Sequence, residues 1–174
     1  IARVELDAEG KFVKQEKFTG TILIARKGEI LLHKAYGQKN DEAGQANTVN
    51  SIYQIASLAK QFTAAVILKL QEQGKLSVKD KVSKYYPGYP NCDKITIHHL
   101  LSHTSGIYNY SDNKAFMAGD QSQPVTLDSM IRLFNNQPLV FEPGSRFSYS
   151  NSGYTLLGYI IEKVTGKSYQ HVLN

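Results

Sequence analysis

The pattern of apolar residues changes once along the chain, from the period of strands to the period of helices, and this change limits the folds open to it. Residues 19–26 (TGTILIAR) and 29–37 (EILLHKAYG) are rich in β-forming residues. They are joined by Lys27-Gly28, a short turn with glycine where a positive φ is needed. We therefore predict a hairpin. After it comes a polar loop over 41–51, and nothing beyond Gly37 reads clearly as a strand.

Helical spacing begins at Ser57, and Gly74 stands where this helix would stop. The predicted apolar stripe consists of Ala59, Phe62, Val66 and Leu70. Shorter helices are predicted over 97–103 and 127–135, behind the caps Thr96 and Thr126. Residues 108–124 between them are polar and predict a surface loop.

A last strong helix is predicted to begin near Ser152, and Gly166 is suited to the position just after its end. Ser168 would cap a further helix. Tyr154, Leu157, Ile161 and Val164 share its predicted face. The fold class is therefore α+β. Since two strands do not make a stable sheet alone, either the hairpin packs only on helices or the rest of the sheet lies in other sequence.

Composition excludes several classes of function. A hydrophobic share of 41% and a charged share of 20% predict a globular domain. The net charge of +5 comes from scattered lysines without a dense basic run, so we expect no nucleic-acid partner. Cys92 is the only cysteine, which excludes an internal disulfide and a cysteine-based zinc cage. No apolar run has the length of a membrane span, and a first residue Ile1 rather than Met is compatible with a removed signal peptide.

Residues 57–60 (SLAK) fit the S-x-x-K pattern of serine acyltransferases, as do residues 111–114 (SDNK). Context separates the two matches, because Ser111 lies in a polar loop whereas Ser57 opens an amphipathic helix. There, positions i and i+3 bring hydroxyl and amine onto one face, and the helix N-terminus favours a developing oxyanion. A free lysine is protonated near neutral pH, so Lys60 can accept a proton only if burial and the helix dipole lower its pKa. The alternative is a capping Ser57 beside a solvent-facing Lys60.

Three segments together resemble the serine β-lactamase and penicillin-binding-protein family, most closely its class C β-lactamase, DD-peptidase and esterase branch. They are 54–64 (QIASLAKQFTA), 100–106 (LLSHTSG) and 149–154 (YSNSGY), in the family's order. The resemblance implies a β-lactamase/transpeptidase-like fold, in which helices flank an antiparallel sheet and form a further helical subdomain. This chain would carry the N-terminal hairpin and the helical part, with the late strands missing.

The resemblance also implies an acyl-enzyme mechanism on a β-lactam, a D-alanyl peptide or an ester, with no cofactor. Ser57 would be the nucleophile, Lys60 its proton acceptor, Tyr149 a proton relay to the leaving group, and Asn151 a ligand of the substrate amide and of Lys60. Alternatively, Tyr149 is a core aromatic and Asn151 an N-cap. A second Tyr-x-Asn match at 89–91 lies in a Pro-rich turn and is set aside.

The family's third motif, Lys or His followed by Thr or Ser and then Gly on a late strand, is absent up to Asn174, because 164–166 (VTG) closes a helix. That strand normally supplies the second N–H of the oxyanion hole. We therefore expect residues 1–174 to be the N-terminal portion of a single domain, weak or inactive alone. Other hypotheses are a penicillin-binding or sensing module that holds its acyl group, and a non-catalytic fragment.

Three further expectations complete the prediction. An incomplete sheet edge would favour association with another chain. The protein would be secreted, periplasmic or bound to the cell envelope. His99 and His103, at i and i+4, could share a helical face, but no Glu follows His99 and no third ligand is near, so no metal site is expected. Residues 103–106 (HTSG) lack the G-x-S-x-G elbow and predict a structural turn rather than a second nucleophile.

Overall fold

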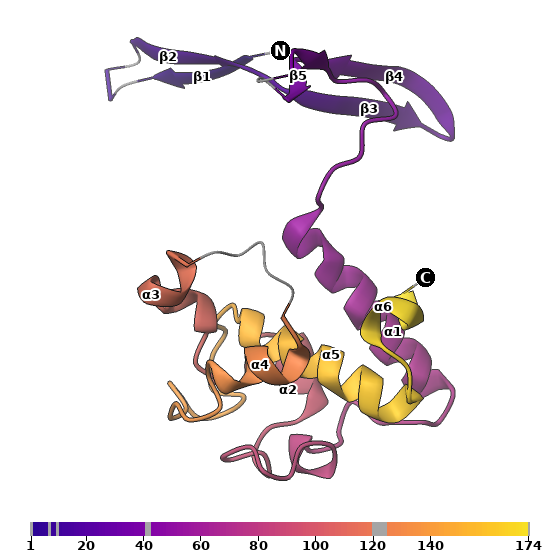
Figure 1. The fold of residues 1–174 in the computed structure, drawn as a ribbon, viewed down its shortest axis with the longest axis vertical. Coiled ribbons are helices and arrows are strands. Elements are labelled where there is room, and N and C mark those ends of the chain that lie inside the picture. The colour runs from indigo at the N-terminus through magenta and orange to yellow at the C-terminus, as the bar shows by residue number, and fades with distance from the viewer. Residues whose placement is uncertain (1, 7, 10, 41–42, 120–124, 174) are drawn as a thin grey trace. The chain divides into compact units, whose positions relative to one another are not determined.

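The computed structural model describes residues 2–6, 8–9, 11–40, 43–119 and 125–173. The chain divides into two compact units, Ile1–Gln54 and Ile55–Asn174, and each is described by itself. Figure 1 shows that the first is built of strands and the second of helices.

Three two-stranded antiparallel sheets make up the N-terminal unit. They are β1 (Ala2–Leu6) with β2 (Phe12–Lys17), β3 (Gly20–Arg26) with β4 (Glu29–Tyr36), and β5 (Gln38–Asn40) with β6 (Gln45–Ala46). The β3–β4 hairpin confirms the sequence prediction. Its turn has Lys27 at φ 51° and Gly28 at φ 84°, the two positive values that a type I′ turn requires.

The prediction of a single hairpin was too narrow. The strands β5 and β6 follow Gly37, where the sequence is mostly polar, and they are three and two residues long. The strands β1 and β2 are five and six residues long and mix charged with apolar residues. Such segments lack the apolar runs by which strands are recognised, and their pairing comes from backbone hydrogen bonds that any sequence can make.

The C-terminal unit consists of helices around α5 (Figure 1). The α-helices are α1 (Ala59–Glu72), α2 (Ile97–Leu101), α3 (Lys114–Met117), α4 (Leu127–Arg132), α5 (Asn151–Thr165) and α6 (Tyr169–Leu173). Short 3-10 turns are η1 (Ala56–Leu58), η2 (Val82–Lys84) and η3 (Tyr110–Asp112). Helix α5 packs against α1, α2, α4 and α6, so it forms the centre of the unit. No helix in the described residues is long and apolar enough to cross a membrane.

Among the described residues, the hydrophobic core lies entirely in this unit. Its members on α5 are Leu156, Leu157, Ile160 and Ile161, all fully buried. The predicted face of α5 is therefore confirmed, although burial extends around more of the helix than one stripe. A helix packed by neighbours on several sides buries more than the usual apolar stripe.

The predicted stripe of α1 was wrong at Phe62, which is 52% exposed. The buried residues of this helix are Thr63, Ile67 and Leu70. The Thr63 hydroxyl bonds the Tyr169 hydroxyl at 2.6 Å. A polar residue satisfied in this way can be buried, and a pattern of apolar residues alone does not predict it.

Helix starts were predicted better than helix ends. Thr96, Thr126 and Ser150 each accept a backbone N–H at the start of α2, α4 and α5. Gly166 closes α5 at φ 67°, and Ser168 bonds the first turn of α6. The helices α2 and α4 end at Leu101 and Arg132, short of the predictions, and η3 and α3 lie within the predicted loop 108–124, whose residues 120–124 are outside the described part.

Candidate active site

Ser57 lies in the 3-10 turn η1, immediately before α1. The residue before it, Ala56, has φ 44°, a left-handed conformation that turns the chain into the helix. Lys60, three residues on, faces the same side, and its Nζ donates a hydrogen bond to Ser57 Oγ at 3.1 Å. The spacing of the S-x-x-K motif thus brings the amine to the hydroxyl, as the sequence predicted.

The Tyr-x-Asn segment meets this pair from the start of α5. The Tyr149 hydroxyl donates to Ser57 Oγ at 2.9 Å, and Lys60 Nζ donates to Asn151 Oδ1 at 2.8 Å. Asn151 is the first residue of α5, and Ser150, not Asn151, is its N-cap. The structure therefore brings together all four residues that were selected from the sequence.

A cavity of about 370 Å³ opens beside Ser57. Residues of both motifs line it together with apolar and aromatic side chains: Ala56, Ser57, Ala59, Lys60, Thr63, Tyr110, Leu127, Asn151, Tyr154, Thr155, Gly158 and Tyr169. A concave site in which aromatic and apolar side chains lie beside polar groups is suited to a small molecule.

The serine that was set aside supports this site. Ser111 Oγ accepts hydrogen bonds from Asn151 Nδ2 at 3.0 Å and from Asn109 Nδ2 at 2.7 Å. Asn109 Oδ1 in turn accepts from the Asn151 backbone N–H at 3.0 Å. Ser111 is thus no nucleophile but orients the Asn151 amide, so that its oxygen faces Lys60. Sequence reasoning missed this role, because no motif marks Asn109 and the S-x-x-K match at Ser111 points to a nucleophile rather than to a supporting residue.

The positive charge of Lys60 acts on the neighbouring phenol. Lys60 Nζ lies 5.1 Å from the centre of the Tyr149 ring. Burial by itself raises the pKa of Tyr149, but the interactions with Lys60 and Ser57 outweigh it and hold this pKa below its ordinary value. The Tyr149 hydroxyl is therefore a better proton donor than a free tyrosine.

The two histidines do not form a metal pair. Helix α2 ends before His103, which has φ 58°, so the two rings do not share a helical face. Each imidazole is used elsewhere, since His99 Nδ1 accepts from the Thr96 backbone N–H and His103 Nδ1 from that of Ser150. Within the described residues, no group of three or more metal-binding side chains occurs.

The HTSG segment forms a turn beside the site, as predicted. Ser105 is 2% exposed, and its Oγ accepts from the Ile107 backbone N–H, so it is not placed as a nucleophile. Gly106 follows at φ 73°, and a Cβ there would overlap the Phe141 carbonyl oxygen. The turn therefore requires glycine both for its φ and for space.

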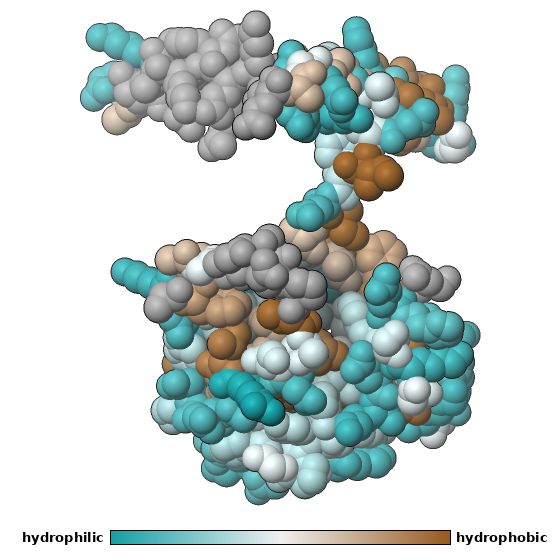
Figure 2. Space-filling view, viewed as in Figure 1, coloured by the Kyte–Doolittle hydropathy of each residue, from teal (hydrophilic) through white to brown (hydrophobic). Residues whose placement is uncertain are grey.

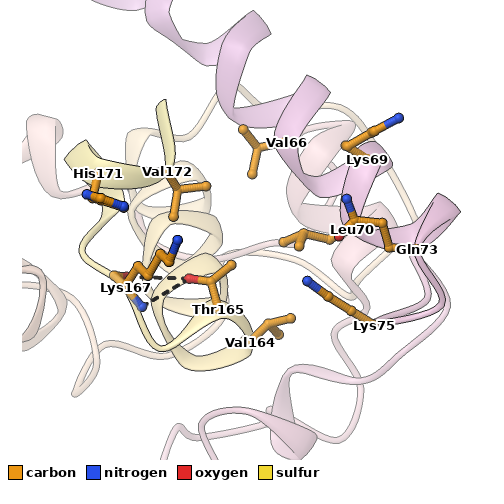
Figure 3. Close-up of a pocket in the computed structure, with 10 residues that line it drawn as sticks. All are labelled: Val66, Lys69, Leu70, Gln73, Lys75, Val164, Thr165, Lys167, His171 and Val172. Atoms are coloured by element: carbon orange, nitrogen blue, oxygen red, sulfur yellow. Dashed lines mark hydrogen bonds between the residues drawn. The ribbon is translucent and has the colours of Figure 1, made fainter. Parts of the chain in front are cut away.

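A separate cavity of about 380 Å³ lies between α1, α5 and α6 (Figure 3). It is lined by Val66, Lys69, Leu70, Gln73, Lys75, Val164, Thr165, Lys167, His171 and Val172. Its one hydroxyl, that of Thr165, bonds the Ile161 carbonyl at 2.7 Å and accepts from the Lys167 backbone N–H at 3.3 Å. Among the hydrogen bonds of the described residues, this hydroxyl has none to a lysine amine of the kind that Ser57 has to Lys60. The Ser57 cavity is therefore the candidate active site.

Comparison with known proteins agrees with this geometry. The model of the family described as Beta-lactamase matches residues 7–174. Penicillin-binding protein 4* of Bacillus subtilis is 39% identical over 159 residues, which are 90% of this chain and 35% of that protein. The teichoic acid D-alanine hydrolase of Staphylococcus aureus is 30% identical over 159 residues, 91% of this chain and 38% of that protein.

Among solved structures, the penicillin-binding protein from Bacillus halodurans superposes with a TM-score of 0.81 at 35% identity, over 89% of this chain and 48% of that one. The chain thus spans between about a third and a half of the proteins it matches. The family match covers almost all of its residues, and the fold it shares is the β-lactamase/transpeptidase-like fold. The chain belongs to the Beta-lactamase family of serine hydrolases and penicillin-binding proteins.

Proposed function

We propose that residues 1–174 are the nucleophile-bearing, N-terminal portion of one serine hydrolase domain that works through an acyl-enzyme. One observation carries the proposal: a serine hydroxyl within 3.1 Å of an amine and 2.9 Å of a phenol, at the mouth of a cavity. A nucleophile needs a base within hydrogen-bond reach, and the base needs a partner that orients it. Lys60 and Asn151 meet these two requirements.

In the proposed acylation, Ser57 Oγ attacks the substrate carbonyl while its proton passes to Lys60 Nζ. The carbonyl electron pair moves to the oxygen, which the backbone N–H of Ser57 stabilises as one donor of an oxyanion hole. When the intermediate collapses, the bond to the leaving group breaks, and the Tyr149 hydroxyl hands a proton to that group. The proton on Lys60 then restores Tyr149.

Deacylation repeats these steps with water in place of serine, so that the carboxylic acid leaves and Ser57 regains its proton. Asn151 Oδ1 holds Lys60 in line throughout. Its Nδ2 carries two hydrogens, one of which is donated to Ser111, and the second would bond the substrate amide.

The proposed substrate is a β-lactam, a D-alanyl peptide or a D-alanyl ester. Support comes from the relatives, of which one is named for penicillin binding and another for hydrolysis of D-alanine from teichoic acid. Such substrates lie outside the cytoplasm, so we propose that the protein is secreted, periplasmic or held at the cell envelope.

A partner is proposed at the β3–β4 hairpin. Figure 2 shows hydrophobic side chains at the surface of the N-terminal unit, and the exposed ones on this hairpin are Leu23, Ile24, Ile30 and Leu31. Unpaired strand edges beside such residues favour pairing with a further strand. A strand of the same hydrolase or a second copy would fit this edge.

The test is intact-mass analysis of the natural protein before and after a fluorescent penicillin and, separately, a fluorophosphonate, with peptide mapping of the adduct. We expect one adduct, on Ser57, and none in the Ser57→Ala variant. Labelling that persists in this variant would refute the assignment. Recovery of the unlabelled mass with released product marks a hydrolase, whereas a lasting penicilloyl adduct marks the penicillin-binding or sensing module.

A further inference from the structure

The ring of His103 packs against the proposed proton relay. Its centre lies 4.5 Å from that of Tyr149, with 32° between the planes, and 5.0 Å from that of Tyr154. Phe147 meets it edge-on at 5.8 Å. Tyr149 is 42% exposed, so protein encloses its ring only in part. The imidazole, and Lys60 Nζ at 5.1 Å from the ring centre, are therefore among its main neighbours.

The same residue also holds the backbone on both sides of Tyr149. The His103 carbonyl accepts from the Ser148 backbone N–H at 2.8 Å, and His103 Nδ1 accepts from the Ser150 backbone N–H at 3.1 Å. Two hydrogen bonds and a ring contact from one side chain and its peptide therefore fix the position of Tyr149. His103 itself has a left-handed conformation, with φ 58°, and both its carbonyl and its ring meet the segment 148–150.

We propose that His103 is a positioning residue that holds the Tyr149 hydroxyl against Ser57, as a neutral imidazole with its proton on Nε2. The proposal rests on the proposed function of Tyr149 and adds a role for a residue that touches neither substrate nor nucleophile. An Nδ1 that accepts the Ser150 N–H carries no proton. Burial, and then the charge of Lys60, lowers the pKa of His103, which agrees with a neutral ring at pH 7.

The charged and titratable groups that face this ring are Lys60 on α1, Tyr149, and Tyr154 on α5. A protonated His103 would lose the Ser150 hydrogen bond and repel Lys60. Since a misplacement of about 1 Å can cost roughly 10²-fold in rate, loss of the imidazole should slow acylation strongly.

The first test is a double-mutant cycle in the natural protein, read as the rate of Ser57 acylation by a fluorescent penicillin, whose ring nitrogen takes the proton that Tyr149 is proposed to deliver. His103→Asn removes the ring but keeps a side-chain hydrogen-bond acceptor, and asparagine tolerates a positive φ. We expect it to slow acylation by about 10-fold or more when Tyr149 is present and by less than about 2-fold in the Tyr149→Phe background. Equal losses in both backgrounds, or no loss in either, would overturn the proposal.

The second test does not need activity. With 3-fluorotyrosine placed at position 149, we expect His103→Asn to shift or broaden the fluorine resonance, while a label at position 85 stays unchanged. If Ser57 is never acylated, the proposed function fails, yet this spectrum still tests the positioning role. A resonance at position 149 that His103→Asn leaves unmoved would refute that role even in an active enzyme.

Discussion

At the scale of single residues, Ser57 Oγ is the point where three side chains act together. Lys60 and Tyr149 bond it directly, and Asn151 bonds Lys60. Each contact has a distinct chemical consequence, because an amine can take the serine proton, a phenol can return one, and an amide can only orient. Substitutions should therefore separate these roles.

Lys60→Met should slow acylation of Ser57 by about 10²- to 10⁴-fold, the usual worth of a positioned general base. A stopped-flow assay with a fluorescent penicillin measures the rate. Lys69→Met is the matched control, because Lys69 lies on the same helix but its exposed side chain pairs only with Glu72. We expect the acylation rate of this control to stay within about 2-fold of the parent rate, because an exposed ion pair contributes little. Similar losses in both variants would argue against a base at position 60.

Lys60→Met should also raise the pKa of Tyr149. The sign follows from charge: a nearby ammonium stabilises the phenolate and lowers this pKa, so removing it moves the pKa upward, toward the ordinary value. A fluorine titration of 3-fluorotyrosine at position 149 measures the change against the parent protein. A pKa that falls or stays constant would show that Lys60 does not act on the phenol.

At the scale of elements, the site depends on the segments that end and begin helices. Helix α2 leads into the HTSG turn, and this turn contacts the start of α5, where Asn151 lies. The Ser148 and Ser150 backbone groups bond His103 in that turn. A change in the turn should therefore reach the site, although no residue of the turn lines the cavity.

Gly106→Ala should destabilise the C-terminal unit by about 2 kcal/mol or more. The new Cβ would meet the Phe141 carbonyl, and an alanine at φ 73° adds about 1–2 kcal/mol of backbone strain. Urea unfolding followed by circular dichroism gives the free energy. Gly74→Ala in the same unit is the control, since a Cβ there meets nothing within 4 Å although φ is 68°. Equal losses at both positions would mean that strain alone, without the clash, decides the cost.

Helix α2 should lose stability in acid through His99. Burial, followed by the nearby His98 and Lys81, lowers the pKa of His99 below 6.5. The stability that the neutral His99 ring contributes is therefore complete above about pH 6.5, and it is lost as the pH falls through the lower pKa of the folded state. Protonation also ends the bond from the Thr96 N–H to Nδ1 in the capping box.

His99→Gln keeps the capping acceptor without titrating, since glutamine is a usual residue at this capping-box position. Urea unfolding at pH 7.5 and pH 5.0 measures the effect. We expect the variant to lose less free energy of unfolding between these two values than the parent does. An equal loss in both proteins would place the acid sensitivity elsewhere, for example at His103.

At the scale of the whole molecule, burial is unevenly divided. Every buried apolar residue among those described, from Ile67 to Ile161, lies in the C-terminal unit, which also holds the candidate site. Several large apolar residues of the N-terminal hairpin are exposed. The stability that holds Ser57, Lys60, Tyr149 and Asn151 together therefore comes from the helical unit.

Leu157→Ala and Leu31→Ala test this division with the same chemical change. Leu157 is fully buried and Leu31 is 53% exposed. We expect the first to cost about 2–5 kcal/mol, because it leaves a cavity in the core, and the second about 0.5 kcal/mol or less. Urea unfolding measures both. A larger cost at Leu31 would show that the hairpin is buried in solution.

The β3–β4 hairpin, the starts of α2 and α4 and the Ser57–Lys60 pair could be predicted because each has a local cause, whereas Tyr149 and Asn151 were selected by resemblance to a family. Lys27-Gly28 suits one turn type, Thr96 and Thr126 offer hydroxyls to the first helical turn, and residues three apart lie on the same face of a helix. The sequence alone therefore determined that Ser57 and Lys60 meet, whatever surrounds them.

Only the tertiary structure decided which other groups reach them. Lys60 and Asn151 are 91 positions apart in the sequence and meet only because α5 packs on α1. The hydrogen bonds of Ser111 and His103 likewise depend on where their loops lie in the folded unit. The buried face of α1 was decided in the same way, because Thr63 bonds Tyr169 across helices. Such long-range contacts arise from the packing of the whole unit, and no local pattern encodes them.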